Sequence, residues 1–303
     1  MRVLVTGGSG LLGLAVRARL RRDGHHVVAV DRTRYQRDDP KLTEMSLDDV
    51  SGLTALVRVH SLDTVVHCGA ISGPMMAKGQ PMAIVDTNIV GTANILEVAR
   101  AEEMRRVVFC SSISVYGNAG RALMTEEFAP HPTSVYAASK AACEQLVEGY
   151  AAEYGVDGVS LRIARVYGPY RRADCFIRDM IAASRSGAET VVPCNPAFLY
   201  HYIYVEDVAD AVFAAMKVER LPARVYNVGS DEVMTMPDIV RIAREVLPDL
   251  NVRIVEGQDD VPDVQEAFDT RRIAADLGFH PSFDLACGIA AYARAFPEPT
   301  SIT

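Results

Sequence analysis

The sequence lacks the features that mark membrane proteins, disulfide-stabilised proteins and nucleic-acid binders. No apolar run reaches the roughly 18 residues that a membrane-spanning helix needs. The six cysteines are scattered without a CxxC pair or metal-ligand spacing, which predicts free thiols, no metal site and a reducing, cytoplasmic compartment. Basic residues number 31 against 39 acidic ones, and the net charge of −8 argues against a nucleic-acid or anionic-membrane partner.

What is present is an ordinary globular composition. The chain has 303 residues, of which 49% are hydrophobic and 23% are charged. A chain of this size buries about 75% of its unfolded surface, so its core needs no metal or disulfide. The length allows one or two domains. A single Arg2 leads directly into a strand-like segment, so we expect no secretory signal.

Short apolar runs alternate with helical patterns through the first half of the chain. Such runs suit parallel strands that are buried on both faces, and strand–helix–strand repetition implies right-handed crossovers. We therefore predict an α/β fold with a doubly wound parallel sheet and a smaller C-terminal lobe. We expect strands at Arg2–Thr6, His26–Asp31, Asp63–Cys68, Arg106–Cys110, Val159–Ile163, Tyr202–Val205 and Val225–Val228, and helices at Leu11–Arg22, Ser51–His60, Asp86–Glu103, Tyr136–Tyr154, Met236–Val246 and Leu285–Ala295.

The alternation weakens after about residue 165, where Pro, Arg and Gly become more frequent. We predict a dinucleotide-binding domain over residues 1–165, to which residues 201–230 return. Residues 166–200 and 231–303 are expected to form a small substrate-binding lobe.

The first strand runs directly into a glycine-rich turn. Gly7, Gly10 and Gly13 are spaced three apart, and glycine allows both the tight turn and a close approach of a pyrophosphate to the backbone. The helix that begins near Leu11 and Leu12 offers free N–H groups and the positive end of its dipole. A glycine-rich turn alone is weak evidence, but its place between strand and helix predicts a Rossmann-type dinucleotide site.

The next strand ends at an acidic residue, Asp31, which lies 18 residues beyond Gly13. A carboxylate there can accept hydrogen bonds from the adenosine ribose and repels a 2′-phosphate, so NAD is favoured over NADP. Arg32 and Arg34 follow at once and offer the alternative, because they could hold that phosphate.

A second group of polar residues has the pattern of an acid/base site. Tyr136 and Lys140 share one face of a helix, and an ammonium beside a phenol favours the phenolate. A phenolate can take or return the proton of an alcohol. Ser112 follows the strand Arg106–Cys110, at the sheet edge where open parallel sheets bind ligands. A YxxxK pair is common by chance, so it is the combination that indicates chemistry.

The ordered set of motifs resembles the extended short-chain dehydrogenases/reductases, specifically the NAD-dependent epimerase/dehydratase family. The resemblance covers nearly the whole chain. The matching pieces are TGGSGLLG, Asp31, HCGA at His67–Ala70, NIVGTAN at Asn88–Asn94, SSISVYG, YAASK, RVYGP at Arg165–Pro169, YIYVEDVADA at Tyr202–Ala211, YNVGS at Tyr226–Ser230 and DLGFHP at Asp276–Pro281.

The resemblance implies a role for each matching position. Tyr136 would be the acid/base, Lys140 would favour its phenolate and hold the nicotinamide ribose, and Ser112 would bind the reacting oxygen. Asn88 would be a catalytic residue with them or would order the site beneath them, and the alternative is a buried amide without a catalytic role. The family also implies a homodimer through a four-helix interface. The implied cofactor contacts are Gly7, Gly10, Leu11, Leu12, Gly13, Asp31, Arg32, Cys68, Gly69, Ala70, Ser111, Tyr136, Lys140, Ile163 and Ala164, and the implied substrate contacts are Ser112, Ile113, Ser114, Arg165 and Tyr200.

Departures from the family pattern reduce the number of reactions that the protein is expected to catalyse. The dehydratases carry an Asp-Glu pair directly after the catalytic Ser/Thr, where this chain has Ile113 and Ser114, which cannot do that acid/base work. Nucleotide-sugar epimerases clamp the diphosphate with two arginines, and the matching stretches here begin at Tyr200 and Asp260. Acidic side chains at the second place, Asp259, Asp260 and Asp263, would repel a diphosphate.

Arginines elsewhere offer a different recognition element. Arg165, Arg171 and Arg172 are expected either to bind a carboxylate or single phosphate at the mouth of the site, or to lie on a solvated loop and pair with acids. His67 is expected to be a packed strand histidine. We therefore expect an NAD-dependent oxidoreductase that acts on a sugar, sugar acid or similar small polar substrate. The alternatives are a nucleotide-sugar epimerase with atypical diphosphate binding and a non-catalytic NAD(P)-binding regulator.

Overall fold

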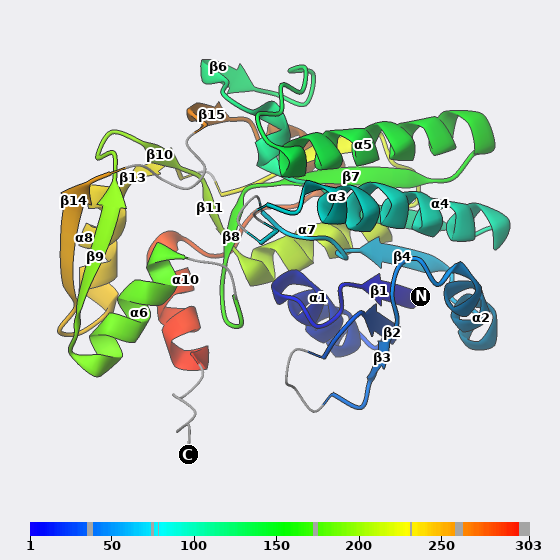
Figure 1. Ribbon diagram of the computed structural model, residues 1–303, viewed down its shortest axis with the longest axis horizontal. Coiled ribbons are helices and arrows are strands. Elements are labelled where there is room, and N and C mark those ends of the chain that lie inside the picture. The colour runs from blue at the N-terminus through cyan, green and yellow to red at the C-terminus, as the bar shows by residue number, and fades with distance from the viewer. Residues whose placement is uncertain are drawn as a thin grey trace.

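The computed structural model describes residues 1–34, 39–73, 76–77, 79–171, 175–230, 232–257 and 263–296. Its centre is a seven-stranded sheet in which every neighbouring pair is parallel (Figure 1). This confirms the predicted fold class. In spatial order the strands are β12 (Val225–Val228), β7 (Gly158–Ile163), β5 (Arg106–Cys110), β4 (Thr64–His67), β1 (Arg2–Thr6), β2 (His26–Asp31) and β3 (Leu42–Glu44).

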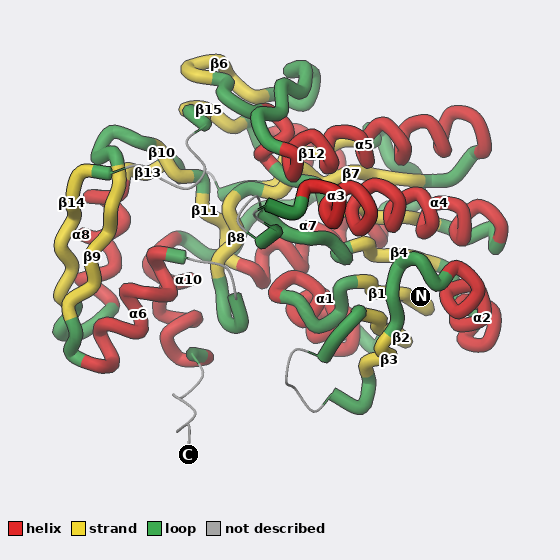
Figure 2. Tube along the Cα trace, viewed as in Figure 1, coloured by secondary structure: helices red, strands yellow, loops and turns green. Residues whose placement is uncertain are grey.

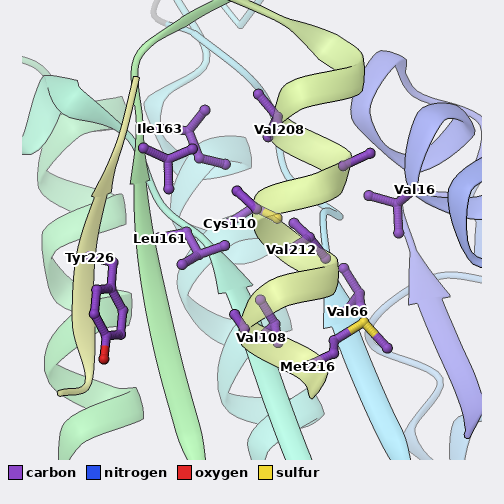
Figure 3. Close-up of a cluster of buried hydrophobic side chains, with 14 of the residues drawn as sticks. Val16, Val66, Val108, Cys110, Leu161, Ile163, Val208, Val212, Met216 and Tyr226 are labelled. Atoms are coloured by element: carbon purple, nitrogen blue, oxygen red, sulfur yellow. The ribbon is translucent and has the colours of Figure 1, made fainter. Parts of the chain in front are cut away.

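Helices cover both faces of this sheet, which is why its central strands are apolar on both sides. One face packs against α1 (Leu11–Arg22) and α7 (Val205–Lys217). Figure 3 shows this core, with Val208 and Val212 of α7 lying over the apolar side chains of the strands. The opposite face packs against α2 (Val50–His60), α4 (Gly91–Ala101) and α5 (Val135–Tyr154).

The helix expected over residues 86–103 is not continuous in the structure. Its first residues, 86–90, belong to a π-helical turn, η1 (Val85–Val90), which follows a short α-helix, α3 (Pro81–Ile84), and α4 begins only at Gly91. Sequence periodicity does not distinguish a π turn from an α turn, so the prediction of one regular helix was wrong at this end. π turns inside helices are frequent at functional sites, and this one carries Asn88.

The smaller lobe has its own core. Helices α6 (Phe176–Ser186), α8 (Met236–Val246) and α10 (Leu285–Ala295) form this lobe with a parallel pair of strands at its outer edge, β9 (Glu189–Cys194) and β14 (Asn251–Glu256) (Figure 2). The predicted helices over 236–246 and 285–295 are therefore confirmed, whereas β9, β14 and α6 were not predicted, although α6 buries Ile177, Met180, Ile181 and Ala183 at helical spacing.

Short elements connect the lobe to the large sheet. β11 (Tyr202–Tyr204) pairs with β8 (Arg165–Tyr167), so the strand expected near residue 202 forms but does not join the seven-stranded sheet. β12 does join it, and α7 packs on its face. The division of the chain at residue 165 stays a prediction. The remaining elements are η2 (Ile113–Tyr116), β6 (Gly120–Met124), which pairs with β15 (Gln265–Phe268), β10 (Leu199–Tyr200), which pairs with β13 (Met234–Thr235), and α9 (Arg271–Leu277).

Among the described residues, no helix has both the length and the apolar character needed to cross a membrane.

Candidate active site

A cavity of about 520 Å³ lies where the strands of the large sheet end and the small lobe begins. Its walls come from segments spread over most of the chain, from the glycine turn after β1 to Gln265 of β15. All the residues that the family resemblance implied as cofactor or substrate contacts line this cavity, whereas Asn88 of the implied catalytic set does not. The predicted residues that line it are Gly7, Gly10, Leu11, Leu12, Gly13, Asp31, Arg32, Cys68, Gly69, Ala70, Ser111, Ser112, Ile113, Ser114, Tyr136, Lys140, Ile163, Ala164, Arg165 and Tyr200.

One end of the cavity is formed by the glycine turn. Gly7 has a φ of 64°, and a Cβ there would lie 2.7 Å from the backbone of Cys68. A Cβ on Gly13 would overlap the carbonyl oxygen of Gly7. The turn thus brings strand and helix backbones closer than side chains allow, and it leaves the first N–H groups of α1 facing the cavity. This cradle fits a pyrophosphate at a helix N-terminus.

Asp31 lies at the same end and is held in place by its neighbours. One carboxylate oxygen accepts hydrogen bonds from the Ser9 amide and hydroxyl, at 3.1 and 2.8 Å, and the other accepts from the Arg32 amide at 2.8 Å. Arg34, a candidate for binding a 2′-phosphate, instead donates its Nε to Glu44 at 2.7 Å and its Nη1 to the Asp39 carbonyl. The acid faces the cavity while Arg34 is engaged elsewhere, which fits NAD.

The predicted catalytic side chains of Ser112, Tyr136 and Lys140 all line the cavity. Tyr136 and Lys140 lie one turn apart on α5 and are 8% and 5% exposed. Lys140 Nζ donates to the Cys110 carbonyl at 2.7 Å and lies 4.7 Å from the centre of the Phe109 ring, so strand β5 holds the ammonium against the sheet edge. Ser112 caps η2 by accepting from the Ser114 amide at 3.2 Å.

Asn88 lies beneath these residues and does not line the cavity. Its amide oxygen accepts from the Ile71 N–H at 2.8 Å, and its Nδ2 donates to the Ile71 carbonyl at 3.2 Å and to Ser139 Oγ at 2.9 Å. Ser139 in turn donates to the Tyr136 carbonyl at 2.7 Å. Asn88 therefore ties the loop after β4 to the helix turn that carries Tyr136, which is the ordering role rather than direct contact.

His67 is a packed strand residue, as its place in β4 suggested. Thr92 Oγ1 donates to the Asn88 carbonyl, so it accepts from the Nε2–H of His67, and Nδ1 of the neutral ring accepts from Thr6 Oγ1 at 2.6 Å. Burial, together with the positive charge of Lys140, lowers the pKa of His67 to about 3. The ring thus stays neutral at neutral pH and braces the strand ends below the cavity.

The other end of the cavity is lined by side chains of the small lobe and its connections. The Arg165 guanidinium lies over the Tyr200 and Tyr202 rings, 5.2 and 5.9 Å from their centres. Arg171 donates to the Val166 carbonyl at 2.7 Å, so its guanidinium turns inward rather than into a solvated loop. Asp263 accepts from Thr133 Oγ1 at 2.8 Å. Arg172, Asp259 and Asp260 lie outside the described residues.

Sequence reasoning missed several residues of the lining. Asp48 and its neighbours follow β3, a three-residue strand too short to show a pattern, and they line the cofactor end. At the opposite end, Gln265 donates to the carbonyls of Ile113 and Gly117, at 3.3 and 2.9 Å, and joins β15 to the loop of Ser112. No local motif predicts that Gln265 lines the site, because its hydrogen-bond partners are about 150 residues away in the sequence. Among the described residues, no three His, Cys, Asp or Glu side chains are grouped as metal ligands.

The fold and the site together define an NAD-dependent enzyme of the extended short-chain dehydrogenase/reductase class. The match of residues 3–229 to the NAD dependent epimerase/dehydratase family shows that the chain belongs to that family.

Curated relatives carry related activities. The chain is 30% identical to dTDP-glucose 4,6-dehydratase of Neisseria meningitidis, over 92% of this chain and 88% of that protein. It is 28% identical to UDP-glucuronate 4-epimerase 4 of Arabidopsis thaliana, over 96% of this chain and 74% of that protein. Among solved structures, MoeE5 in complex with UDP-glucose and NAD is 29% identical, with a TM-score of 0.86 and coverage of 97% of this chain and 98% of that one. Such similarity confirms the family and NAD as cofactor.

Proposed function

We propose that the protein is an NAD-dependent oxidoreductase that interconverts a secondary alcohol and a carbonyl on a sugar, sugar acid or similar small polar substrate. The observation that carries this proposal is that Ser112, Tyr136 and Lys140 line the same cavity as the glycine turn and Asp31. One cavity therefore contains both the proton acceptor and the residues that would bind NAD. Retention of both Tyr136 and Lys140 speaks against a non-catalytic regulator.

The side chains of the chain move the proton and orient the reacting oxygen. Tyr136 takes the hydroxyl proton in the oxidation and returns it in the reduction. Lys140, held at the Cys110 carbonyl, places a positive charge that stabilises the phenolate. Ser112 donates to the oxygen that becomes a carbonyl. When bound, NAD accepts the hydride from the carbinol carbon or gives it back.

Substrate recognition is assigned to Ser112, Ile113, Ser114, Arg165 and Tyr200, all of which line the cavity. Ile113 and Ser114 lack the acid and base that a dehydratase places there, so we assign no dehydration. Tyr200 stands where an arginine would clamp a diphosphate, and its ring stacks with that of Tyr202 at 5.8 Å. The carboxylate of Asp263 also lines the cavity. This lining supports a substrate without a diphosphate.

A second candidate function is a nucleotide-sugar 4-epimerase. The relatives named UDP-glucuronate 4-epimerase support it, since they match almost the whole chain. The same three residues would serve, because an epimerase oxidises a carbinol and reduces the ketone from its other face. It would need a diphosphate contact other than the two family arginines.

Incubation of the protein with NAD and panels of uronates, aldoses, hydroxy acids and UDP-sugars separates the two candidates. Nicotinamide absorbance and product stereochemistry are followed together. Stoichiometric NADH with a free sugar or sugar acid is the expected result. Formation of an epimer from a UDP-sugar without net NADH would contradict the oxidoreductase and establish the second candidate. A Tyr136→Phe sample is the matched blank for both readouts.

We also propose a homodimer and a cytoplasmic location. Exposed apolar side chains are present on α3, η1 and both ends of α5, namely Met82, Val90, Val135 and Tyr154, and α4 and α5 run side by side at the surface (Figure 1). The helix pair supports a four-helix interface between two copies of the chain. The cytoplasmic location is supported by the six free thiols, which suit a reducing compartment.

The dimer is tested by sedimentation, which should give a dimer for the protein and a monomer for Val90→Glu. A monomeric wild-type protein would contradict the interface.

A further inference from the structure

Two cysteines lie against each other in the wall of the cavity. Cys110 ends β5, and Cys68 directly follows β4. His67 pairs with Phe109 in the parallel register, so Cys68 and Cys110 are the next opposed pair. Their Sγ atoms are 3.6 Å apart, and both residues line the cavity. The proposed hydride and proton transfer uses neither thiol.

We propose that Cys68 and Cys110 are a redox modification site, at which hydrogen peroxide converts the two thiols into a disulfide that switches off NAD binding. The Cys68 sulfur attacks a peroxide oxygen, which leaves a sulfenic acid and releases one water. The Cys110 sulfur then attacks the Cys68 sulfur, forms the S–S bond and expels the sulfenic oxygen as a second water. The two thiols lose two electrons and two protons, and hydrogen peroxide gains them.

The geometry allows this bond with a small movement. Neighbouring strands lie about 4.8 Å apart, within the range of about 4.4–6.8 Å between Cα atoms that a disulfide bridges. Opposed residues of parallel strands point to the same side of the sheet, so side-chain rotation and a slight approach of the strand ends close the remaining distance between the sulfurs.

The surroundings assign an order to the two steps. Cys68 is half-buried, whereas Cys110 is 5% exposed and packs under α7 beside Val208 and Leu161 (Figure 3). A peroxide that enters the cavity therefore meets Cys68 first, and Cys110 is the resolving thiol. Cys287, on α10 of the small lobe, is exposed and offers a reference thiol outside the cavity.

A bridge at this place would disturb two parts of the cofactor site. The carbonyl of Cys110 accepts the hydrogen bond from Lys140 Nζ. The backbone of Cys68 lies directly under Gly7, where no room remains even for a methyl group. Drawing the two strand ends together moves the Lys140 anchor and the floor of the glycine turn at once. Loss of NAD binding is the expected consequence.

The groups around Cys68 affect the pKa of its thiol and therefore the pH at which the reaction is fast. The hydrogen bond with Cys110, burial and the nearby Asp31 raise the pKa of the Cys68 thiol, against the lowering effect of Lys140. Since the thiolate is the nucleophile, the pair reacts slowly near neutral pH and faster as the pH rises.

The test treats the purified, reduced protein with hydrogen peroxide and follows three readouts. Peptide mass spectrometry should find a Cys68–Cys110 linked peptide that has lost two hydrogen atoms. NAD binding, measured by calorimetry without substrate, should be lost in parallel and return with dithiothreitol. Saturation with NAD before treatment should slow both changes. These readouts need no turnover, so they stand whether or not the proposed reaction is found.

Variants separate the pair from general oxidation. Each variant is scored by the fraction of its own untreated NAD binding that survives. Cys287→Ser should lose binding as the wild type does, whereas Cys110→Ser should form no link and should not recover with dithiothreitol once Cys68 is over-oxidised. Loss of NAD binding without the linked peptide, or a Cys110→Ser response that matches wild type in rate and reversibility, would overturn the proposal. Cys110→Ala replaces Cys110→Ser if the latter does not fold.

Discussion

The two ends of the cavity are built in different ways. The cofactor end is made largely of backbone, from one turn between β1 and α1 and from the ends of adjacent strands in one continuous sheet. The substrate end is made of side chains that arrive from the pair of β8 and β11, from β10 and from β15, which belong to three two-stranded pairs outside the large sheet. Binding of a ligand by the backbone requires glycine at fixed positions, so it can be recognised as a sequence motif. Binding by side chains from distant segments depends on tertiary contacts and gives no such motif.

The largest expected effect is the loss of turnover on removal of the Tyr136 hydroxyl. Tyr136→Phe removes the hydroxyl that carries the proton, and we expect kcat to fall by about 10²–10⁴-fold, which is the usual contribution of a general acid/base. NAD binding should stay close to wild type because the ring remains. Steady-state kinetics and calorimetry measure the two quantities. Tyr154→Phe makes the same change at the exposed end of α5 and should behave as wild type. Turnover retained by Tyr136→Phe would disprove the acid/base assignment.

The next effect tests the backbone character of the cofactor end. Gly13→Ala places a methyl group against the Gly7 carbonyl, so the turn must move, and we expect NAD affinity to fall by about 10²-fold. Gly149→Ala is the matched control, because nothing lies within 4 Å of a Cβ there and its helix position favours alanine by about 0.5–1 kcal/mol. Titration with NAD and thermal unfolding report the outcome. Unchanged affinity in Gly13→Ala would show that the turn tolerates side chains.

A pH effect tests the strand ends beneath the cofactor. Because the pKa of His67 is lowered from its ordinary 6.5 to about 3, the unfolded chain binds the extra proton first as the pH falls. The contribution of the neutral ring to the free energy of unfolding is complete above pH 6.5 and is lost as the pH falls from there to about 3. At pH 5 the loss is about 2 kcal/mol. Denaturant unfolding at several pH values should show a shallower acid limb for His67→Gln, and the wild-type slope for the exposed His280→Gln. Equal slopes in all three proteins would contradict the linkage.

The smallest effect is expected at the substrate end. Gln265→Ala removes the two hydrogen bonds to the carbonyls of Ile113 and Gly117, and we expect KM to rise by about fivefold, equivalent to about 1 kcal/mol. NAD affinity should not change, since the glycine turn is untouched. Gln145→Ala, on the exposed side of α5, is the control. If Gln265→Ala instead weakened NAD binding more than substrate binding, the two ends would not be separate.

The family motifs predicted almost all the residues that line the cofactor end of the cavity. The turn from Gly7 to Gly13, the acid Asp31 and the helix pair of Tyr136 and Lys140 all line one cavity, because each depends on spacing within a single strand–turn–helix unit. Apolar runs likewise predicted the seven-stranded core except for β3. The π turn at Val85–Val90 escaped prediction because α and π turns share the same apolar pattern.

The contacts that could not be predicted are those between segments far apart in the chain. Nothing in the local sequence shows that Gln265 contacts the loop of Ser112, that Arg165 lies over Tyr200, or that Cys68 and Cys110 touch. Local patterns specify turns, helices and apolar faces because those depend on neighbouring residues. Strand order and lobe packing depend on which distant surfaces bury each other, and in this protein they set the shape of the substrate end and the thiol pair in its wall.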